Sequence, residues 1–174
     1  SILPNFISET SENYSIVLAF LVVAVVEEGF KFLFLYKRTW NDPNFNFRFD
    51  GIVYAVSVSL GFAAIENLEY VLGYGLAVAP TSSLLAIPGH LSFSVFMGTC
   101  YGYAKLKADQ GNTVQSKVSL VFSYLSAVLL HGFYDSCAMI NTSTSNLYFI
   151  IFIIIMYITV FIMIRHVAKN DRPI

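Results

Sequence analysis

The sequence predicts an all-α membrane protein, a polytopic bundle of about five transmembrane helices. Of its 174 residues, 56% are hydrophobic and only 12% are charged, whereas a soluble domain carries about 25% charged residues. The hydrophobic residues fall into five runs of about 20 residues, the length needed to cross a bilayer. Backbone groups in lipid must be paired within their own segment, so each run is predicted to be a helix. Residues 1–174 are expected to form one integral membrane domain.

The five hydrophobic runs define the predicted spans in order. They cover residues 14–36, 51–78, 84–104, 118–140 and 147–164. The segments between them are predicted to be polar links, with the sequences KRTWNDPNFNFRFD, APTSS, KLKADQGNTVQSK and NTSTSN. A multi-pass protein of the cell membrane is therefore expected.

The basic residues predict the orientation. Nine of the ten lie in links or tails on one side of the predicted membrane: Lys37, Arg38, Arg48, Lys105, Lys107, Lys117, Arg165, Lys169 and Arg172. By the positive-inside rule that side is cytoplasmic, so the N-terminus is expected outside and the C-terminus inside. The net charge of −1 gives no reason to expect a nucleic-acid partner, and the lipid bilayer is the predicted surrounding.

Eight ionisable residues lie inside the predicted spans. They are Glu27, Glu28, Lys31, Glu66, Glu69, His90, His131 and Asp135. A charged side chain at the centre of a bilayer costs about 2.5–3.5 kcal/mol, so eight such groups facing lipid separately would hinder insertion. We therefore expect them to face one another around a polar cavity that opens toward the extracytoplasmic side.

Helical spacing places most of these groups on defined faces. Glu27 and Lys31 are four residues apart and can pair, whereas Glu28 points about 100° away, toward another helix. Three later spans each carry one polar stripe at the same spacing: Phe62, Glu66 and Tyr70; His90, Ser94 and Gly98; His131 and Asp135. Glu69 fits no stripe and is expected to be structural, as are the small residues of the GxxxG pattern beside His90.

These residue types favour acid–base chemistry. One carboxylate is enough to pair Lys31, so the second glutamate of the pair is a candidate general base that activates water and protonates a leaving amine. His131 can donate a hydrogen bond to an oxyanion, and Asp135 can orient it. The alternative is purely structural: an ion pair with Lys31, and hydrogen bonds between helices from Glu66, Asn67, His90 and His131.

Four motifs, in order on four predicted helices, resemble the PrsW family of intramembrane proteases. EEGFK resembles its EExxK motif, FAAIENLEY its FxxxEN…Y motif, HLSFSVFMG its histidine motif and HGFYD its HxxxD motif. The resemblance covers about residues 25–135. It implies that Glu27, Glu28, Glu66, His90, His131 and Asp135 are catalytic, with Lys31, Asn67 and Tyr70 in support.

The family is similar to the CAAX prenyl proteases and to a scaffold subunit of gamma-secretase. The resemblance implies that Glu27 activates water, that His131 and Asp135 serve the oxyanion, and that the substrate is a membrane-anchored protein such as an anti-sigma factor. Two positions differ from the prenyl protease pattern, which has His where this chain has Glu66 and Asn where it has Asp135. His90 is a candidate for the missing imidazole, and the partner of Glu27 stays open.

The need for a metal stays open too. Glu27, Glu66, His90 and His131 are of the types that bind Zn²⁺ beside a water, but the HExxH helix of zinc proteases is absent and Lys31 adds a cation. The sequence favours metal-independent, glutamate-based hydrolysis and predicts no firm cofactor.

Three alternatives stay open: a zinc-dependent intramembrane protease, a proton-coupled carrier and a non-catalytic membrane scaffold. A carrier would show a polar path to both faces and internal repeats. A scaffold would tend to lose its carboxylates.

Overall fold

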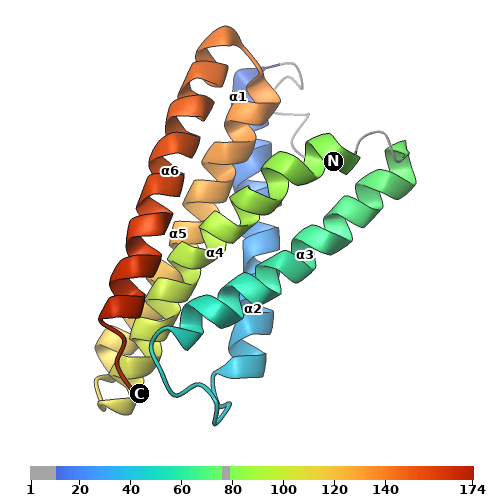
Figure 1. Cartoon of the computed structure of the whole chain (residues 1–174). Helices are drawn as coiled ribbons and strands as arrows, with labels where there is room; N and C mark the ends of the chain where they lie inside the picture. The colour runs from blue at the N-terminus through green and yellow to red at the C-terminus, as the bar shows by residue number, and fades with distance from the viewer. Residues whose placement is uncertain (1–10, 76–78) are drawn as a thin grey trace.

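The structure, a computed structural model, describes residues 11–75 and 79–174 and is almost entirely helical. Its elements are α1 (Glu12–Val17), η2 (Leu18–Ala24), α2 (Val25–Thr39), α3 (Asp50–Tyr74), α4 (Ala79–Asp109), α5 (Thr113–Ile140) and α6 (Ser143–Lys169). The first three follow one another without a break, so the described residues form five helical rods, one for each predicted span (Figure 1). The predicted all-α bundle is confirmed.

The helix ends differ from the predicted spans. The prediction that APTSS forms a link is wrong, because the backbone of α4 is already helical from Ala79. Hydropathy marks only the part of a helix that lies in lipid, and a proline near the first turn does not prevent a helix from starting earlier. At the other end of that connection, α3 stops at Tyr74 because Gly75 has a φ of 86°, a left-handed conformation that glycine adopts readily. Residues 76–78 of the predicted second span lie outside the described residues.

Three of the described helices are long and apolar enough to cross a membrane by length and composition alone. They are Asp50–Gly73 of α3, together with α5 and α6. The first rod differs because a π-helical segment, η2, interrupts it and because it carries Glu27, Glu28 and Lys31. The π-helix is a rare element that is often found near functional sites, and nothing in the hydropathy pattern predicted it.

The helices pack in an order that brings distant segments together. α3 runs along α4, α4 along α5, and the first rod packs on α5 mainly through η2, while α6 covers α5 and α4 (Figure 1). The axes of α3 and α4 approach closely because glycines face each other. A Cβ atom on Gly98 would lie 2.6 Å from the carbonyl oxygen of Gly51. The packing role expected of the small residues after His90 is thereby confirmed.

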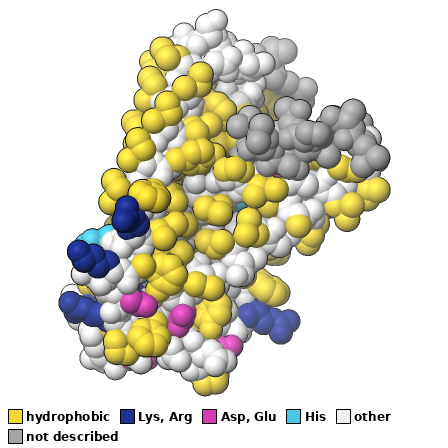
Figure 2. Space-filling model, in the orientation of Figure 1, with side chains coloured by type: hydrophobic (Ala, Val, Ile, Leu, Met, Phe, Trp, Pro, Cys, Tyr) yellow, Lys and Arg dark blue, Asp and Glu magenta, His cyan; other side chains and the backbone are white. Residues whose placement is uncertain are grey.

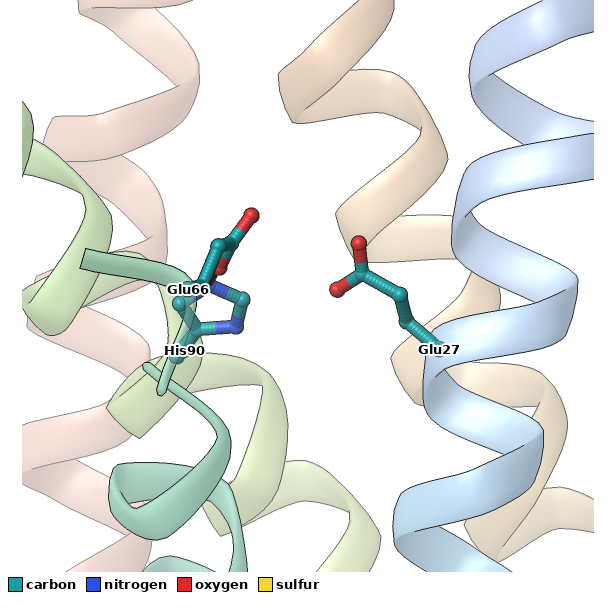
Figure 3. A group of neighbouring side chains, drawn as sticks. All are labelled: Glu27, Glu66 and His90. Carbon is teal, nitrogen blue, oxygen red and sulfur yellow. Dashed lines mark hydrogen bonds and ion pairs between the residues drawn. The ribbon is translucent and has the colours of Figure 1, made fainter. Parts of the chain in front are cut away.

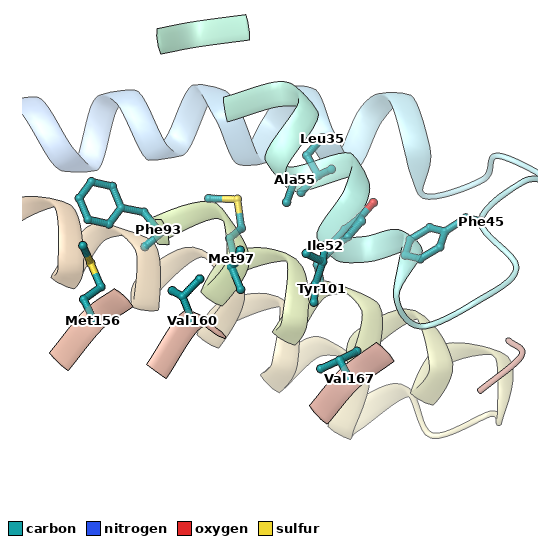
Figure 4. Packing of buried hydrophobic residues seen from close by; sticks show 12 residues of the cluster. Leu35, Phe45, Ile52, Ala55, Phe93, Met97, Tyr101, Met156, Val160 and Val167 are labelled. Carbon is teal, nitrogen blue, oxygen red and sulfur yellow. The ribbon is translucent and has the colours of Figure 1, made fainter. Parts of the chain in front are cut away.

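A buried apolar cluster fills the space between the rods (Figure 4). Leu35, Ile52 and Tyr101 join α2, α3 and α4, and Phe45 from the connection before α3 stacks on Tyr101 at 5.3 Å between ring centroids. The Tyr101 hydroxyl lies 2.8 Å from Oγ1 of Thr39, which satisfies both buried groups. The cluster continues along α4 to Phe93 and Met97, so apolar packing lies between the polar site described below and the end of the bundle that carries the C-terminus.

The basic side chains gather at that same end. Lys and Arg in the view of Figure 2 lie near the C-terminus marked in Figure 1, where α2, α4 and α6 end and α3 and α5 begin. The antiparallel order of the helices thus places the nine basic residues of links and tails at one end, as predicted. That this end faces the cytoplasm stays a prediction.

Candidate active site

Polar side chains from α2, α3, α4 and α5 meet in one connected network. The network has two parts. The buried triad consists of Glu28, Lys31 and His131, whose side chains are at most 5% exposed. The carboxylate pocket is an open cavity lined by Glu27, Glu66, Glu69 and Tyr70. The sequence-based expectation that ionisable groups from four helices face one another is confirmed.

The buried triad is centred on one oxygen of Glu28. Its Oε1 accepts a hydrogen bond from Lys31 Nζ at 2.7 Å and lies 2.8 Å from His131 Nδ1. The other nitrogen of His131, Nε2, lies 3.2 Å from Asp135 Oδ2. Glu28 therefore reaches across to α5, as the 100° rotation from Glu27 predicted, and His131 and Asp135 pair as expected. Neither nitrogen of His131 is left to point into the carboxylate pocket.

Aromatic packing holds His131 in place. Phe93 of α4 stacks on the imidazole with ring centroids 5.0 Å apart and planes 18° apart. One residue after His131, a Cβ atom on Gly132 would collide with the ring of Phe20, so only glycine lets η2 approach α5 this closely. The π-helical segment ends at Ala24, three residues before Glu27. It therefore sets the position of the first rod beside His131.

Lys31 pairs with both glutamates, but unequally. Its Nζ lies 3.6 Å from Glu27 Oε2 and 2.7 Å from Glu28 Oε1. The predicted Glu27–Lys31 pair is present, yet Glu28 is the closer partner of the lysine. Of the two carboxylates, it is Glu27 that is left to face the pocket.

The carboxylate pocket brings two acids to face each other. The side chains of Glu27 and Glu66 are 28% and 33% exposed, and they line cavities of about 290 and 210 Å³. Figure 3 shows the Glu27 carboxylate pointing across a gap toward Glu66 and His90. Glu69 and Tyr70, one turn farther from the basic end of the bundle, complete the wall. This places the pocket on the side that the sequence analysis expects to be extracytoplasmic.

His90 connects the two parts. Its Nδ1 lies 2.9 Å from Lys31 Nζ, and its Nε2 lies 2.8 Å from Glu66 Oε2. An ammonium group has hydrogen-bond donors only, so with Lys31 charged Nδ1 accepts and Nε2–H donates to Glu66. Ser59 of α3 also donates to the His90 backbone carbonyl at 3.0 Å. The imidazole is thus held in one tautomer at the edge of the pocket.

Glu27, Glu66 and His90 each offer one atom, and these atoms lie within 4.8 Å of one another. Hydrogen bonds to water are about 2.8 Å long, so a single water molecule can contact all three. By type, two carboxylates and an imidazole are also reasonable Zn²⁺ ligands. The contact with Lys31 does not fit that role, because a metal on Nε2 requires the hydrogen on Nδ1, where the ammonium stands. His131, the fourth expected ligand, belongs to the buried triad instead.

Glu69 lines the pocket with Glu27 and Glu66, and the structural role expected of it stays a prediction. The three-residue spacing between Glu66 and Glu69 places both on one helix face, as a spacing of four does. Of the supporting residues, Tyr70 lines the pocket, and the side-chain amide of Asn67 donates to the Ala63 carbonyl of its own helix at 2.8 Å.

Comparisons with known proteins place the chain in a family. The profile of a family described as PrsW family intramembrane metalloprotease matches residues 2–164. Proteins named Protease PrsW are similar to the chain: that of Clostridioides difficile is 34% identical over 84% of the chain, that of Geobacillus kaustophilus 39% over 67%, and that of Bacillus subtilis 37% over 76%. The aligned parts cover 63%, 50% and 57% of these relatives, so the chain spans little more than half their length. No solved structure gives a significant match.

Proposed function

The chain belongs to the PrsW family of intramembrane proteases, and we propose that it acts as one, hydrolysing a peptide bond in a membrane-anchored protein with water activated by a glutamate. The observation that carries the proposal is the carboxylate pocket. Two acids and an imidazole from three helices face one cavity within reach of a single water molecule. A bundle held together by ion pairs alone would have no need to keep Glu27 and Glu66 open to solvent.

In the proposed reaction, Glu27 acts as general base. Its carboxylate takes a proton from the water as the water oxygen bonds to the carbonyl carbon of the substrate, and the tetrahedral intermediate carries the negative charge on the former carbonyl oxygen. Glu27 then gives the proton to the amide nitrogen as the carbon–nitrogen bond breaks, which leaves a carboxylic acid and an amine. General base and acid catalysis of this kind contributes about 10²–10⁴-fold.

His90 and Glu66 are proposed to position the water and to stabilise the intermediate. The Nε2–H of His90 now donates to Glu66, and it borders the pocket where the oxyanion would form. This assignment differs from the role that the family resemblance implies for His131. His90 offers an atom within 4.8 Å of Glu27 and Glu66, whereas His131 is directed at Glu28 and Asp135. We propose that His131 and Asp135 support Glu28 and Lys31, which in turn hold His90.

The substrate is proposed to be a protein anchored in the same membrane. The pocket opens among helices whose outer surfaces are apolar. A substrate segment that is already in the membrane can reach the pocket without passing through water, so a membrane-anchored substrate is favoured over a soluble one. An anti-sigma factor is the substrate class implied by the resemblance. A proton-coupled carrier is less well supported, because the apolar cluster around Leu35, Ile52 and Tyr101 fills the bundle between the site and its basic end.

Zinc-dependent hydrolysis is the second candidate, favoured by the donor types of Glu27, Glu66 and His90. Elemental analysis of the purified protein, with turnover measured before and after dialysis against a strong chelator, separates the two. We expect turnover to survive chelation and no stoichiometric metal to be found. Loss of turnover that returns with added Zn²⁺ would replace the glutamate mechanism with the metal mechanism.

The proposal itself is tested with the purified chain in lipid vesicles, using a panel of membrane-spanning peptides with a fluorophore and a quencher at opposite ends. Cleavage by the native chain and none by Glu27→Ala is the expected result. Equal turnover by Glu27→Ala, with the variant folded as judged by circular dichroism, would exclude Glu27 as the base.

A further inference from the structure

A second cavity, of about 400 Å³, lies between α2 and α3 beside the carboxylate pocket. We call it the apolar groove, and it is lined by Phe34, Ser57, Val58, Gly61, Phe62 and Ile65. Resting on the proposed function, we propose that this groove is the specificity pocket of the protease: it holds a large apolar side chain of a membrane-embedded substrate segment, next to the bond that is cut.

The chemistry of the lining selects an apolar occupant. Phe34, Val58, Phe62 and Ile65 present hydrocarbon, and the hydroxyl of Ser57 donates to the Val53 carbonyl of its own helix at 2.8 Å. The groove also has room beside Gly61, because a Cβ atom there would have no other atom within 4 Å. Its volume lies in the range of pockets that bury small ligands, enough for a large side chain.

The groove is continuous with the carboxylate pocket, which argues for a protein segment as its occupant. Phe62 and Ile65 line the groove and also the cavity that contains Glu27, Glu66 and Glu69. Lys31 Nζ lies over the ring of Phe62, 5.7 Å from its centroid. One face of this ring therefore contacts the buried triad. A side chain placed in the groove would bring its own backbone to the two open carboxylates, whereas a lipid acyl chain has no group for them.

The packing of the helices leaves a way in from the membrane. α3 packs mainly along α4 and only weakly against α2, and the groove residues Phe34 and Ile65 are 50% and 61% exposed. Exposed apolar side chains of a membrane bundle face lipid. A substrate segment can therefore approach sideways between α2 and α3. It must be unwound where it is cut, because each carbonyl of an intact helix is hydrogen-bonded to the amide four residues on.

The first arm of the test fills the groove. Gly61→Phe places a ring in the vacant space, and Gly73→Phe is its matched control, because Gly73 lies on the same helix, also has no atom within 4 Å of a Cβ, and does not line the groove. Membrane peptides are compared that differ only in carrying Leu or Ala at the residue preceding the cut, which mass spectrometry identifies. Leaving an apolar pocket unfilled costs 10–200-fold in kcat/KM.

We expect Gly61→Phe to lower kcat/KM for the Leu peptide at least ~10-fold while changing the Ala peptide much less. Gly73→Phe should leave both unchanged. An equal fall for both peptides, or no change for either, would overturn the specificity pocket even though cleavage continues.

The second arm does not depend on cleavage. Phe34 is replaced by the photoreactive residue p-benzoylphenylalanine in the Glu27→Gln background, and the control carries it at Ile154 of α6, which is 54% exposed and equally open to lipid. With a Leu-rich transmembrane peptide in the vesicles, we expect peptide adducts at 34 and not at 154. Adducts to lipid alone at position 34 would reject the groove as a substrate site. If peptide adducts form at 34 but the native chain, with Glu27 intact, cleaves none of the peptides, the groove stands as a binding site and the proposed function is rejected.

Discussion

Glu27 and Glu28 are adjacent in sequence but belong to different regions of the molecule. Glu28 is in the buried triad, 1% exposed, with Lys31 and His131 at hydrogen-bond distance from a single oxygen. Glu27 is 28% exposed and faces Glu66 across the carboxylate pocket. A helix rotates about 100° per residue, so one EE pair places one carboxylate in the buried triad and the other in the open pocket. Under the proposed mechanism, the buried triad holds the open carboxylate in place without itself contacting the substrate.

The largest effect is expected from breaking the buried triad. Lys31→Met removes the cation beside Glu28 and His90, and Glu28 then keeps only His131, since its Oε2 already lacks a partner among the described residues. Breaking a buried pair in this way costs about 3–5 kcal/mol. We expect a markedly lower midpoint of thermal unfolding in detergent, together with lost turnover.

A double variant sharpens that result. Replacing both members of a buried pair by apolar residues of similar volume is often neutral for stability, so Glu28→Met with Lys31→Met should unfold at a higher temperature than Lys31→Met alone. Turnover should not return, because His90 still lacks its contact with Lys31. Recovery of turnover along with stability would show that the triad acts only as packing.

A smaller effect is expected at the edge of the triad. Asp135→Asn weakens the contact with His131 Nε2 at 3.2 Å, and Asp135 is itself partly exposed. Hydrogen bonds to charged groups contribute about 1.5–3 kcal/mol, and the partial exposure places this one near the lower limit. Thermal unfolding in detergent measures the loss, with Glu69→Gln as a control at an exposed site. A loss as large as that of Lys31→Met would mean that the triad extends to Asp135.

The smallest effect is expected from Glu69 in the open pocket. Its side chain is exposed and it lies beside Glu27 and Glu66. An exposed substitution usually changes stability by no more than about 0.5 kcal/mol. We expect Glu69→Gln to unfold at the same temperature as the native chain. It should lower kcat/KM only a few-fold, because a charge interacts weakly with its neighbours in a solvated site. A loss as large as that of Glu27→Gln would make Glu69 a member of the catalytic set.

The sequence predicted those parts of the structure that follow from composition and helical spacing. The five rods follow from hydrophobic length, and the Glu27–Lys31 and His131–Asp135 pairs follow from a spacing of four. It did not predict the contact between Lys31 and His90, since nothing in either helix fixes how far α2 slides along α4. That offset is set by tertiary contacts between the two helices, such as the one between Thr39 Oγ1 and the Tyr101 hydroxyl at 2.8 Å.

Two features of the fold do not follow from the sequence, for physical reasons. The π-helical turn of η2 leaves no mark in hydropathy, yet it determines how the first rod meets Gly132. Hydropathy does not mark the helical backbone of APTSS, because its residues are polar or small. A hydropathy pattern shows only the part of a helix that lies in the bilayer, and α4 continues beyond that part. For η2, packing against α5 rather than local sequence sets the position of the first rod.

If the two adjacent glutamates have separate tasks, one paired measurement should separate them. Glu27→Gln and Glu28→Gln are purified in parallel, and turnover of one membrane peptide and the midpoint of thermal unfolding are measured for each. The account predicts that Glu27→Gln loses about 10²–10⁴-fold in turnover at native stability, while Glu28→Gln unfolds at a distinctly lower temperature. Native turnover in Glu27→Gln, or native stability in Glu28→Gln, would contradict it.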